Sequence, residues 1–169
     1  METEQGLAAV VAMFERVRAR RNCIYVIGNG GSATIASHLA IDLVNACQIR
    51  SFTLHESSFL TCMANDYGYE QAFSRLLGQV AMPGDVLVAV SSSGRSPNIR
   101  NSVQRLAAAG DCEVLTLSGF AADNPLRATG DINIWLDSKD YGMVEVSHQF
   151  ILHNVVDRLR TNMVKCVAP

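Results

Sequence analysis

Short apolar runs alternate with longer segments of helical periodicity along nearly the whole chain. The apolar runs are predicted to be strands, at residues 23–28, 51–56, 85–91, 112–119 and 131–137. The remaining segments repeat apolar residues near every 3.6 positions and are predicted to be helices, at residues 3–20, 32–47, 57 onward, 69–80, 99–109 and 144–164. This alternation predicts a parallel sheet covered on both faces by helices, of which the first and last are long.

The composition limits the classes to which the protein belongs. Its 169 residues, 49% of them hydrophobic, suffice for one domain, which we expect to span residues 1–169. The formal net charge is −2, and Lys and Arg form no basic stripe, so we expect no nucleic-acid partner. No apolar run approaches the ~20 residues of a membrane span, and we expect no membrane partner.

The cysteines and the first residues of the chain indicate a compartment. The five cysteines, an odd number, form no C-x-x-C pair, which favours reduced thiols over a disulfide framework. The opening METEQGLAAV carries acidic residues where a signal peptide has a basic region. We therefore expect a cytoplasmic protein.

Two predicted strand-to-helix turns, GNGGS at residues 28–32 and SSSGRS at residues 91–96, are candidate ligand sites. Ligands of parallel sheets bind beyond the carboxyl ends of the strands, where both turns lie. Glycines let a ligand approach the backbone closely, and a helix N-terminus attracts an anion. The second turn also gathers four hydroxyls, more than helix capping requires.

The first turn also fits the dinucleotide fingerprint G-x-G-x-x-A, through Gly28, Gly30 and Ala33. Glu56 is then the candidate acid for a ribose. This interpretation leaves the serine-rich turn unexplained, and a Walker A loop is excluded because no Gly-Lys-Ser/Thr follows. A hydroxyl-rich loop without lysine suits a sugar phosphate monoester better than a nucleoside triphosphate; ordinary helix caps are the alternative without a ligand.

Four segments together resemble the sugar isomerase (SIS) family: GNGGS followed by a histidine and an aspartate, ANDYG, SSSGRS, and VE followed by two histidines. Within this family they are most similar to the bacterial phosphoheptose isomerases. The resemblance runs in order over nearly the whole chain. It implies a three-layer, flavodoxin-like α/β sandwich with a five-stranded parallel sheet. It also implies a homotetramer with active sites between subunits.

The resemblance further implies roles for individual residues. The phosphate of a phosphorylated sugar binds Ser91, Ser92, Ser93 and Ser96. The other substrate-binding residues are Asn29, Gly30, Gly31, Ser32, Asn65, Asp66 and Glu145. One zinc ion, or another divalent metal, is bound per site by His38, Asp42, Glu145 and His153.

Two of the four metal positions depart from the family's pattern. Asp42 stands where the family has glutamate, and Glu145 stands where it has glutamine. Two imidazoles and two carboxylates still suit Zn²⁺, with a slight shift toward harder ions such as Mn²⁺ or Fe²⁺. Gly142 occupies the neighbourhood of an acidic family position, so one sugar contact of the family is not matched.

Spacing on the predicted helices supports these ligands unequally. His38 and Asp42 are four residues apart on one helical face, which suits a metal ion or a plain hydrogen-bonded pair. Glu145 and His153 are eight residues apart, about 12 Å along a helix, so spacing alone nominates no shared ion. His148 is one turn from Glu145, and we expect it to support the site or an interface rather than to bind metal.

The reaction implied by the resemblance is a metal-dependent aldose–ketose isomerisation. It converts sedoheptulose 7-phosphate to D-glycero-D-manno-heptose 7-phosphate, a precursor of lipopolysaccharide or capsule. A proton moves between C1 and C2 through an enediolate, with Asp42 as base and His153 as acid. Firm metal binding would make Asp42 a poor base. The alternatives are a non-catalytic SIS module, acting as a sugar-phosphate-binding regulator or a protein adaptor, and a dinucleotide-binding protein.

Overall fold

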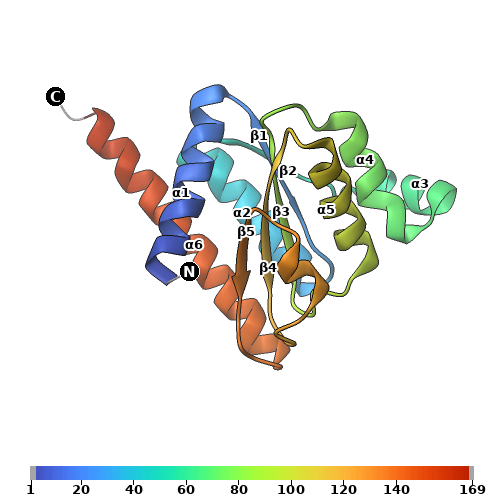
Figure 1. Cartoon of the computed structure of the whole chain (residues 1–169). Helices are drawn as coiled ribbons and strands as arrows, with labels where there is room; N and C mark the ends of the chain where they lie inside the picture. The colour runs from blue at the N-terminus through green and yellow to red at the C-terminus, as the bar shows by residue number, and fades with distance from the viewer. Residues whose placement is uncertain (1–2, 168–169) are drawn as a thin grey trace.

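Five parallel strands form the centre of the computed structural model, which describes residues 3–167 (Figure 1). The strands are β1 (Cys23–Ile27), β2 (Arg50–Thr53), β3 (Val86–Ser91), β4 (Glu113–Ser118) and β5 (Ile132–Trp135). Their order in the sheet is β2-β1-β3-β4-β5, and every neighbouring pair is parallel. The predicted five-stranded parallel sheet is confirmed.

Helices cover both faces of the sheet (Figure 1). One face is covered by α1 (Thr3–Arg20), α2 (Gly31–Cys47) and α6 (Tyr141–Val167). The other is covered by α4 (Ala72–Val80) and α5 (Pro97–Ala109), with α3 (Ser57–Tyr67) packed against α4. Along β3, Val86 and Val88 face the first layer while Leu87 and Ala89 face the second, as the two-residue period of a strand requires. The predicted three-layer sandwich is therefore confirmed.

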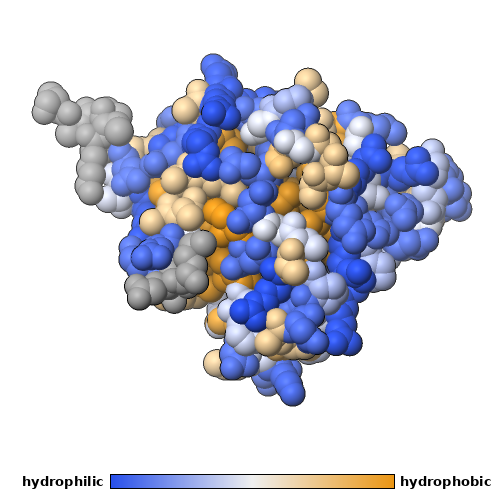
Figure 2. All heavy atoms as spheres, in the orientation of Figure 1, coloured by the Kyte–Doolittle hydropathy of each residue, from blue (hydrophilic) through white to orange (hydrophobic). Residues whose placement is uncertain are grey.

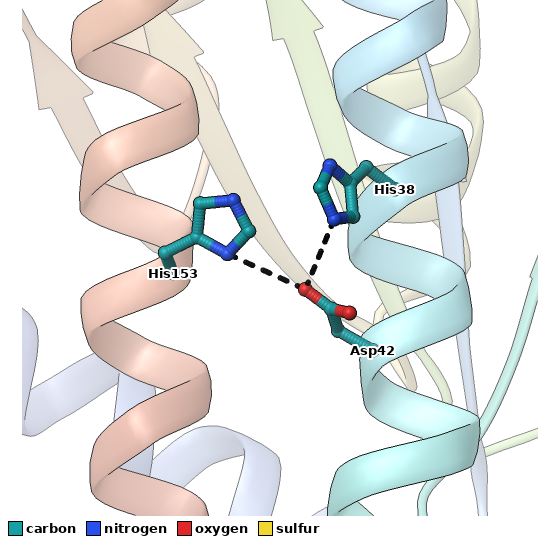
Figure 3. A group of neighbouring side chains, drawn as sticks. All are labelled: His38, Asp42 and His153. Carbon is teal, nitrogen blue, oxygen red and sulfur yellow. Dashed lines mark ion pairs between the residues drawn. The ribbon is translucent and has the colours of Figure 1, made fainter.

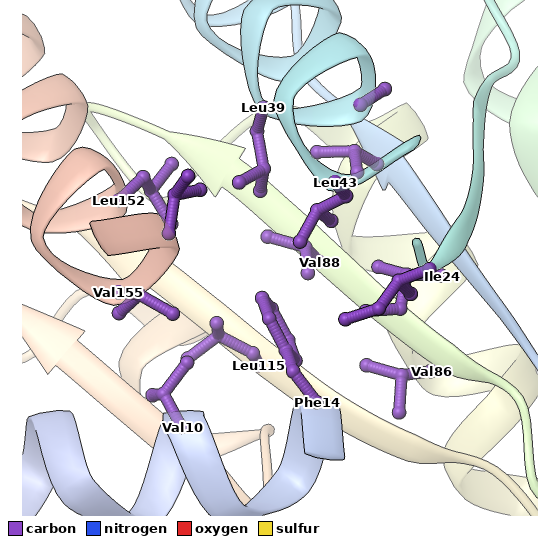
Figure 4. Close-up of a cluster of buried hydrophobic side chains, with 14 of the residues drawn as sticks. Val10, Phe14, Ile24, Leu39, Leu43, Val86, Val88, Leu115, Leu152 and Val155 are labelled. Atoms are coloured by element: carbon purple, nitrogen blue, oxygen red, sulfur yellow. The ribbon is translucent and has the colours of Figure 1, made fainter. Parts of the chain in front are cut away.

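The larger hydrophobic core lies under α1, α2 and α6 (Figure 4). Figure 4 labels Val10, Phe14, Leu39, Leu43, Leu152 and Val155 from the helices, and Ile24, Val86, Val88 and Leu115 from the strands. Burying each of these side chains contributes about 1.5–3 kcal/mol. Because Leu39 of α2 and Leu152 of α6 share this core, the two helices are held in a fixed relation to each other.

Side-chain caps explain two boundaries that differ from the prediction. The second strand ends at Thr53 rather than at residue 56, because the Glu56 carboxylate caps α3 by accepting the N–H of Phe59 at 3.0 Å. The last helix begins at Tyr141 rather than at residue 144, because Asp140 accepts the N–H of Met143 at 3.0 Å. Glu56 thus serves as a helix cap, which weakens its candidacy as a ribose ligand.

The segment at residues 69–80 is also divided differently from the prediction. A single 3₁₀ turn covers Tyr69–Gln71, and α4 begins only at Ala72. Gly68 precedes the turn with a φ of 84°, a conformation that favours glycine. The turn packs against α5, where Asn101 Nδ2 donates to the carbonyl oxygen of Glu70 at 2.9 Å.

The two candidate turns flank one crevice of the sheet. β1 and β3 are neighbours, with Ile27 beside Ala89. The chain leaves β1 for α2 on one face and leaves β3 for α5 on the other. In open parallel sheets, the point where connections leave to opposite faces forms a ligand-binding crevice. The fold therefore brings both predicted turns to the usual location of a site.

Hydrophilic residues cover most of the view in Figure 2, especially over α3, α4 and α5. A strip of exposed apolar residues lies elsewhere, along α2 and α6: Ile41, Val44, Met143, Val146 and Phe150 are between 52% and 71% exposed. We call these five residues the apolar strip. Within residues 3–167, no helix combines the length and the apolar character needed to cross a bilayer.

Asp85 connects three segments at the amino end of the sheet and gives a test of the fold. Its buried carboxylate accepts the N–H of Cys23 at 2.8 Å, the N–H of Met82 at 2.8 Å and the side-chain amide of Asn22 at 3.1 Å. We predict that Asp85→Ala lowers the free energy of unfolding by about 2–4 kcal/mol, because two backbone donors lose their charged acceptor. Urea denaturation measures this change.

The matched control is Asp123→Ala, which removes an exposed aspartate between β4 and β5. It should change the free energy of unfolding by less than about 0.5 kcal/mol. A loss at Asp85 no larger than that of the control would show that its hydrogen bonds do not stabilise the fold.

Candidate functional site

A cavity of about 310 Å³ lies between the two predicted turns. Its lining is formed by Asn29, Gly30, Gly31, Ser32, Val90, Ser91, Ser92, Ser93, Ser96, Tyr141 and Glu145. The structure thus brings together the first turn, the serine turn and two residues of α6, Tyr141 and Glu145. This grouping was expected from the sequence for every one of these residues except Val90 and Tyr141.

Both turns present donors to the cavity. Gly30 precedes α2 with a φ of 54°, and Ser96 precedes α5; neither helix start has a side-chain cap. The hydroxyl of Ser92 is buried without a hydrogen-bond partner among the described residues, although Ser92 lines the cavity. Two helix N-termini and an unpaired buried hydroxyl form a suitable environment for an anion.

Asn29 is held by two residues that the sequence did not single out. Its side chain forms a reciprocal amide pair with Asn98 of α5, with both N–O distances 2.9 Å. The hydroxyl of Tyr69 donates to Asn29 Oδ1, also at 2.9 Å. Asn98 is oriented in turn, because its Oδ1 accepts the N–H of Ile99 at 3.0 Å.

This network fixes which atoms of Asn29 face a ligand. Its Oδ1 already accepts two hydrogen bonds, and one N–H of Nδ2 is donated to Asn98. Among the residues that the structure describes, none accepts the remaining N–H, so Asn29 has a donor to offer at the cavity wall. The sequence does contain an asparagine, Asn98, directly after Pro97 in the first turn of a predicted helix. Because its partner Asn29 is 69 residues away, the pair has no local sequence signal.

Three of the predicted metal ligands form one cluster (Figure 3). His38 and Asp42 come from α2 and His153 comes from α6, with one ligand atom of each within 4.8 Å of the others. Asp42 Oδ2 lies 3.7 Å from His38 Nε2 and 3.4 Å from His153 Nδ1. These distances exceed those of a good hydrogen bond.

The cluster fits a divalent metal better than a plain hydrogen-bonded pair. Zinc binds imidazole nitrogen and carboxylate oxygen at about 2.0–2.2 Å, so tetrahedral ligands lie about 3.4 Å apart, close to the spacing found here. The amide of Gln149 lies 2.8 Å from His153 Nε2. The atom nearest the ring is the amide nitrogen of Gln149, which donates to Nε2, so the ring proton lies on Nδ1, toward Asp42. An ion at Nδ1 would require the Gln149 amide to turn its carbonyl toward the ring and the proton to lie on Nε2.

Glu145, the fourth predicted ligand, lies in the cavity rather than in the cluster. Its carboxylate packs against Gly31 at the first residue of α2, where a Cβ on Gly31 would collide with it. His153 follows eight residues later on the same helix, about 12 Å farther along the axis. The described residues therefore provide three ligands at one place and a carboxylate at another.

Asn65 and Asp66 lie outside the lining of the cavity. Both are exposed at the end of α3, where Asn65 Nδ2 donates to Asp66 Oδ1 at 2.9 Å. Tyr69, the residue immediately after ANDYG, contacts the cavity wall instead, through its hydrogen bond to Asn29. The predicted substrate contacts of Asn65 and Asp66 stay predictions.

His148 is fully buried between α6 and β4. Its Nε2 lies 3.2 Å from the carbonyl oxygen of Ser118, which accepts the N–H of the neutral ring. Burial lowers the pKa of His148 to about 4, and the Ser118 hydrogen bond offsets this only in part. The structure therefore places His148 in the packing of α6 against the sheet; that it binds no metal stays a prediction.

The buried His148 makes stability depend on pH. Between about pH 4 and 6.5 the unfolded chain binds a proton at this residue that the folded chain does not bind, so stability falls as pH falls. We predict that this loss, up to about 1.4 kcal/mol per pH unit, is reduced in His148→Gln, which does not titrate. Urea denaturation at several pH values measures both slopes.

His148→Gln retains a donor for Ser118 and is expected to be less stable than the unsubstituted chain at pH 7. The decisive quantity is the difference between the two proteins as a function of pH, since all other titrating groups are shared. A difference that stays constant from pH 7 to 4 would contradict the assignment of a neutral, buried histidine.

Comparisons with known proteins agree with this geometry. The family model for the SIS domain matches residues 1–119. A phosphoheptose isomerase of Pelobacter propionicus is 33% identical over 157 residues, which cover 89% of this chain and 82% of that protein. Another, of Trichlorobacter lovleyi, is 32% identical over 148 residues, which cover 84% of this chain and 74% of that protein.

A similarity to a solved structure extends to the last helix. The structure of phosphoheptose isomerase GmhA from Neisseria gonorrhoeae has a TM-score of 0.83 at 25% identity. The aligned region covers 93% of this chain and 86% of that one. The sequence resemblance first noted in four short segments thus extends over the fold.

Proposed function

Because the chain belongs to the SIS domain family, with phosphoheptose isomerases as its relatives, we propose that it is a metal-dependent sugar-phosphate isomerase. The proposed reaction interconverts sedoheptulose 7-phosphate and D-glycero-D-manno-heptose 7-phosphate through an enediolate. The observation that carries this proposal is the cavity in which a serine turn, a glycine turn and one carboxylate meet. A sugar phosphate needs such a combination of anion site and polar wall.

The phosphate belongs on the serine turn in this proposal. The buried Ser92 hydroxyl has no partner among the described residues, and leaving such a group unpaired costs about 1–3 kcal/mol. A phosphate oxygen would accept this hydrogen bond, beside the amino end of α5. Gly30, Gly31 and Ser32 then lie along the sugar, with the free N–H of Asn29 toward one of its oxygens.

His38, Asp42 and His153 would hold the metal ion. A divalent ion bound there supplies positive charge beside the oxygens on which negative charge develops. With its amide turned so that the carbonyl faces the ring, Gln149 would hold the tautomer of His153 that exposes Nδ1. The roles of Asp42 as base and His153 as acid stay predictions, since this proposal uses both side chains as metal ligands.

The apolar strip supports the proposed homotetramer. Ile41 directly precedes Asp42, and Phe150 lies one helical turn before His153, so exposed apolar residues share the two packed helices with the histidine cluster. Large exposed apolar side chains grouped on neighbouring helices favour a protein contact. A site between subunits, one domain over residues 1–169 and a cytoplasmic location complete the proposal.

The assay that tests this function uses the purified full-length protein with sedoheptulose 7-phosphate. We predict turnover that is lost after treatment with a chelator and restored by Zn²⁺ or Mn²⁺. His38→Ala and Asp42→Ala should each lower bound metal and reduce kcat by orders of magnitude, because three ligands are the minimum for the ion. Elemental analysis and product formation are the two measurements.

Asp157→Ala is the matched control, because Asp157 is an exposed aspartate of α6 outside the cluster and should leave metal content and turnover unchanged. Undiminished turnover by metal-free protein would contradict the metal dependence. A metal-loaded protein that binds sugar phosphates, seen as a thermal shift, but converts no C5–C7 ketose phosphate would instead support the non-catalytic SIS module.

The Asn29 network gives a second test of the substrate wall. We predict that Tyr69→Phe raises KM by about two- to tenfold with little change in kcat, because one hydrogen bond that orients Asn29 is lost. Tyr67→Phe is the control: it removes a hydroxyl two residues away and keeps the ring that stacks with Arg75. Equal KM values for the two variants would show that the Tyr69 hydroxyl does not orient Asn29 for binding.

A further inference from the structure

Tyr141 and Phe120 form an aromatic pair at the wall of the cavity. Tyr141 is the first residue of α6 and lines the cavity. Phe120 lies two residues beyond the end of β4, and the centroids of the two rings are 4.7 Å apart, with the ring planes at 72°. Aromatic side chains prefer such an edge-to-face arrangement. The pair thus connects the end of β4 with the start of α6.

Phe120 is held in a backbone conformation that a bulky residue rarely adopts. Its φ is 59°, in the left-handed region that favours glycine. The N–H of Phe120 donates to the carbonyl oxygen of Ser138 at 2.8 Å. The N–H of Gly119 donates to the carbonyl oxygen of Ser92, in the serine turn, at 2.9 Å. Residues held in unfavourable conformations by their surroundings are concentrated at functional sites, which directs attention to the Phe120 ring.

The start of α6 is held against the same turn. Val144 is fully buried, and a Cβ on Gly119 would collide with its side chain, so the absence of a side chain at residue 119 lets α6 approach. Tyr141 precedes Val144 by three residues and therefore lies on the same face of the helix. The backbone of both segments thus sets the position of the aromatic pair.

The lining of the cavity is polar except at Tyr141. The other lining side chains carry hydroxyls, one amide and one carboxylate, apart from Val90, which is fully buried and exposes no apolar surface. Tyr141 is 60% exposed, so among the lining residues it offers the accessible apolar surface. A sugar phosphate presents C–H groups as well as hydroxyls and a phosphate, and an aromatic ring suits those C–H groups.

We propose that Tyr141 is a substrate-binding residue whose ring packs against the C–H groups of the sugar, and that Phe120 is the positioning residue that holds this ring at the cavity. This inference rests on the proposed function and deepens it, because it assigns the surface that the carbon chain of the substrate contacts. Such a contact stabilises the bound substrate and the transition state alike. It therefore lowers KM and leaves kcat unchanged.

The first test removes the ring in the metal-loaded, full-length protein. We expect Tyr141→Ala to raise KM for sedoheptulose 7-phosphate by about five- to twentyfold, because an aromatic contact is lost. The kcat should stay within about twofold, and the metal content should be unchanged. Tyr141→Phe keeps the ring and should return KM to within about threefold of the unsubstituted protein.

Phe59→Ala is the matched control for the loss of an exposed aromatic ring. Phe59 is 54% exposed on α3 and does not line the cavity. The variant should retain the KM, the kcat and the metal content of the unsubstituted protein. The control separates a contact at the cavity from a general effect of removing aromatic surface.

A second variant tests the positioning role of Phe120. Glycine adopts a left-handed φ readily, so Phe120→Gly removes the ring without adding backbone strain. We expect KM to rise by about two- to fivefold with kcat unchanged, because the Tyr141 ring loses its support. Since Phe120 acts through Tyr141, Phe120→Gly combined with Tyr141→Ala should have the KM of Tyr141→Ala alone. A further rise in the double variant would overturn the positioning role.

The remaining outcomes separate this inference from the proposed function. An active protein whose Tyr141→Ala variant keeps its KM, or loses kcat instead, would overturn the inference alone. Tyr141→Phe as impaired as Tyr141→Ala would also overturn it, because the hydroxyl and not the ring would then bind. So would a smaller assembly of Tyr141→Ala in size-exclusion chromatography, which would make the pair a subunit contact.

Thermal shifts with sedoheptulose 7-phosphate extend the test to a protein without turnover. A shift that is lost in Tyr141→Ala, in a protein that converts no ketose phosphate, would refute the isomerase and support this inference. The absence of both turnover and shift in the unsubstituted metal-loaded protein would refute both.

Discussion

β1 and β3 pair as neighbours, and the candidate site depends on that pairing. Adjacent strands lie about 4.8 Å apart, so the turns that follow β1 and β3 meet across a single strand spacing. With another strand between them the separation would be about 10 Å, too far for Asn29 and Asn98 to exchange two hydrogen bonds. From β1 the chain continues to β2, and from β3 it continues to β4, in opposite directions along the sheet, so α2 and α5 cover opposite faces. The N-termini of both helices then lie at one cavity.

The second constraint is the packing of α6 on α2. Leu39 and Leu152 share a core with the sheet, and the sides of the two helices that remain outside this core carry His38, Asp42 and His153. The histidine–aspartate cluster is thus held by hydrophobic contacts beneath it rather than by its own polar contacts. Glu145 enters the cavity from the same helix, so the cluster and the cavity share two supporting elements.

The sequence predicts the layers and the two turns well because these depend on local periodicity. Strands buried on both faces, such as Val86–Ser91, read as continuous apolar runs between turn residues. The contact of Tyr69 with Asn29 spans 40 residues, and the place of Glu145 depends on how α6 crosses α2, so neither has a local signal. The strand predicted to include Glu56 ends at Thr53, because the Glu56 side chain caps α3.

α6 fixes the distance between the cavity and the histidine cluster. Glu145 and His153 lie on one uninterrupted helix, so the axial rise of about 12 Å between them does not change when loops move. One residue inserted between them would rotate His153 by about 100° and take it away from α2. The distance between the cavity and the histidine cluster is therefore fixed by a single helix. How far a functional group reaches from its helix depends instead on the length of its side chain, as with an aspartate rather than a glutamate at position 42. It also depends on the turns that face α6.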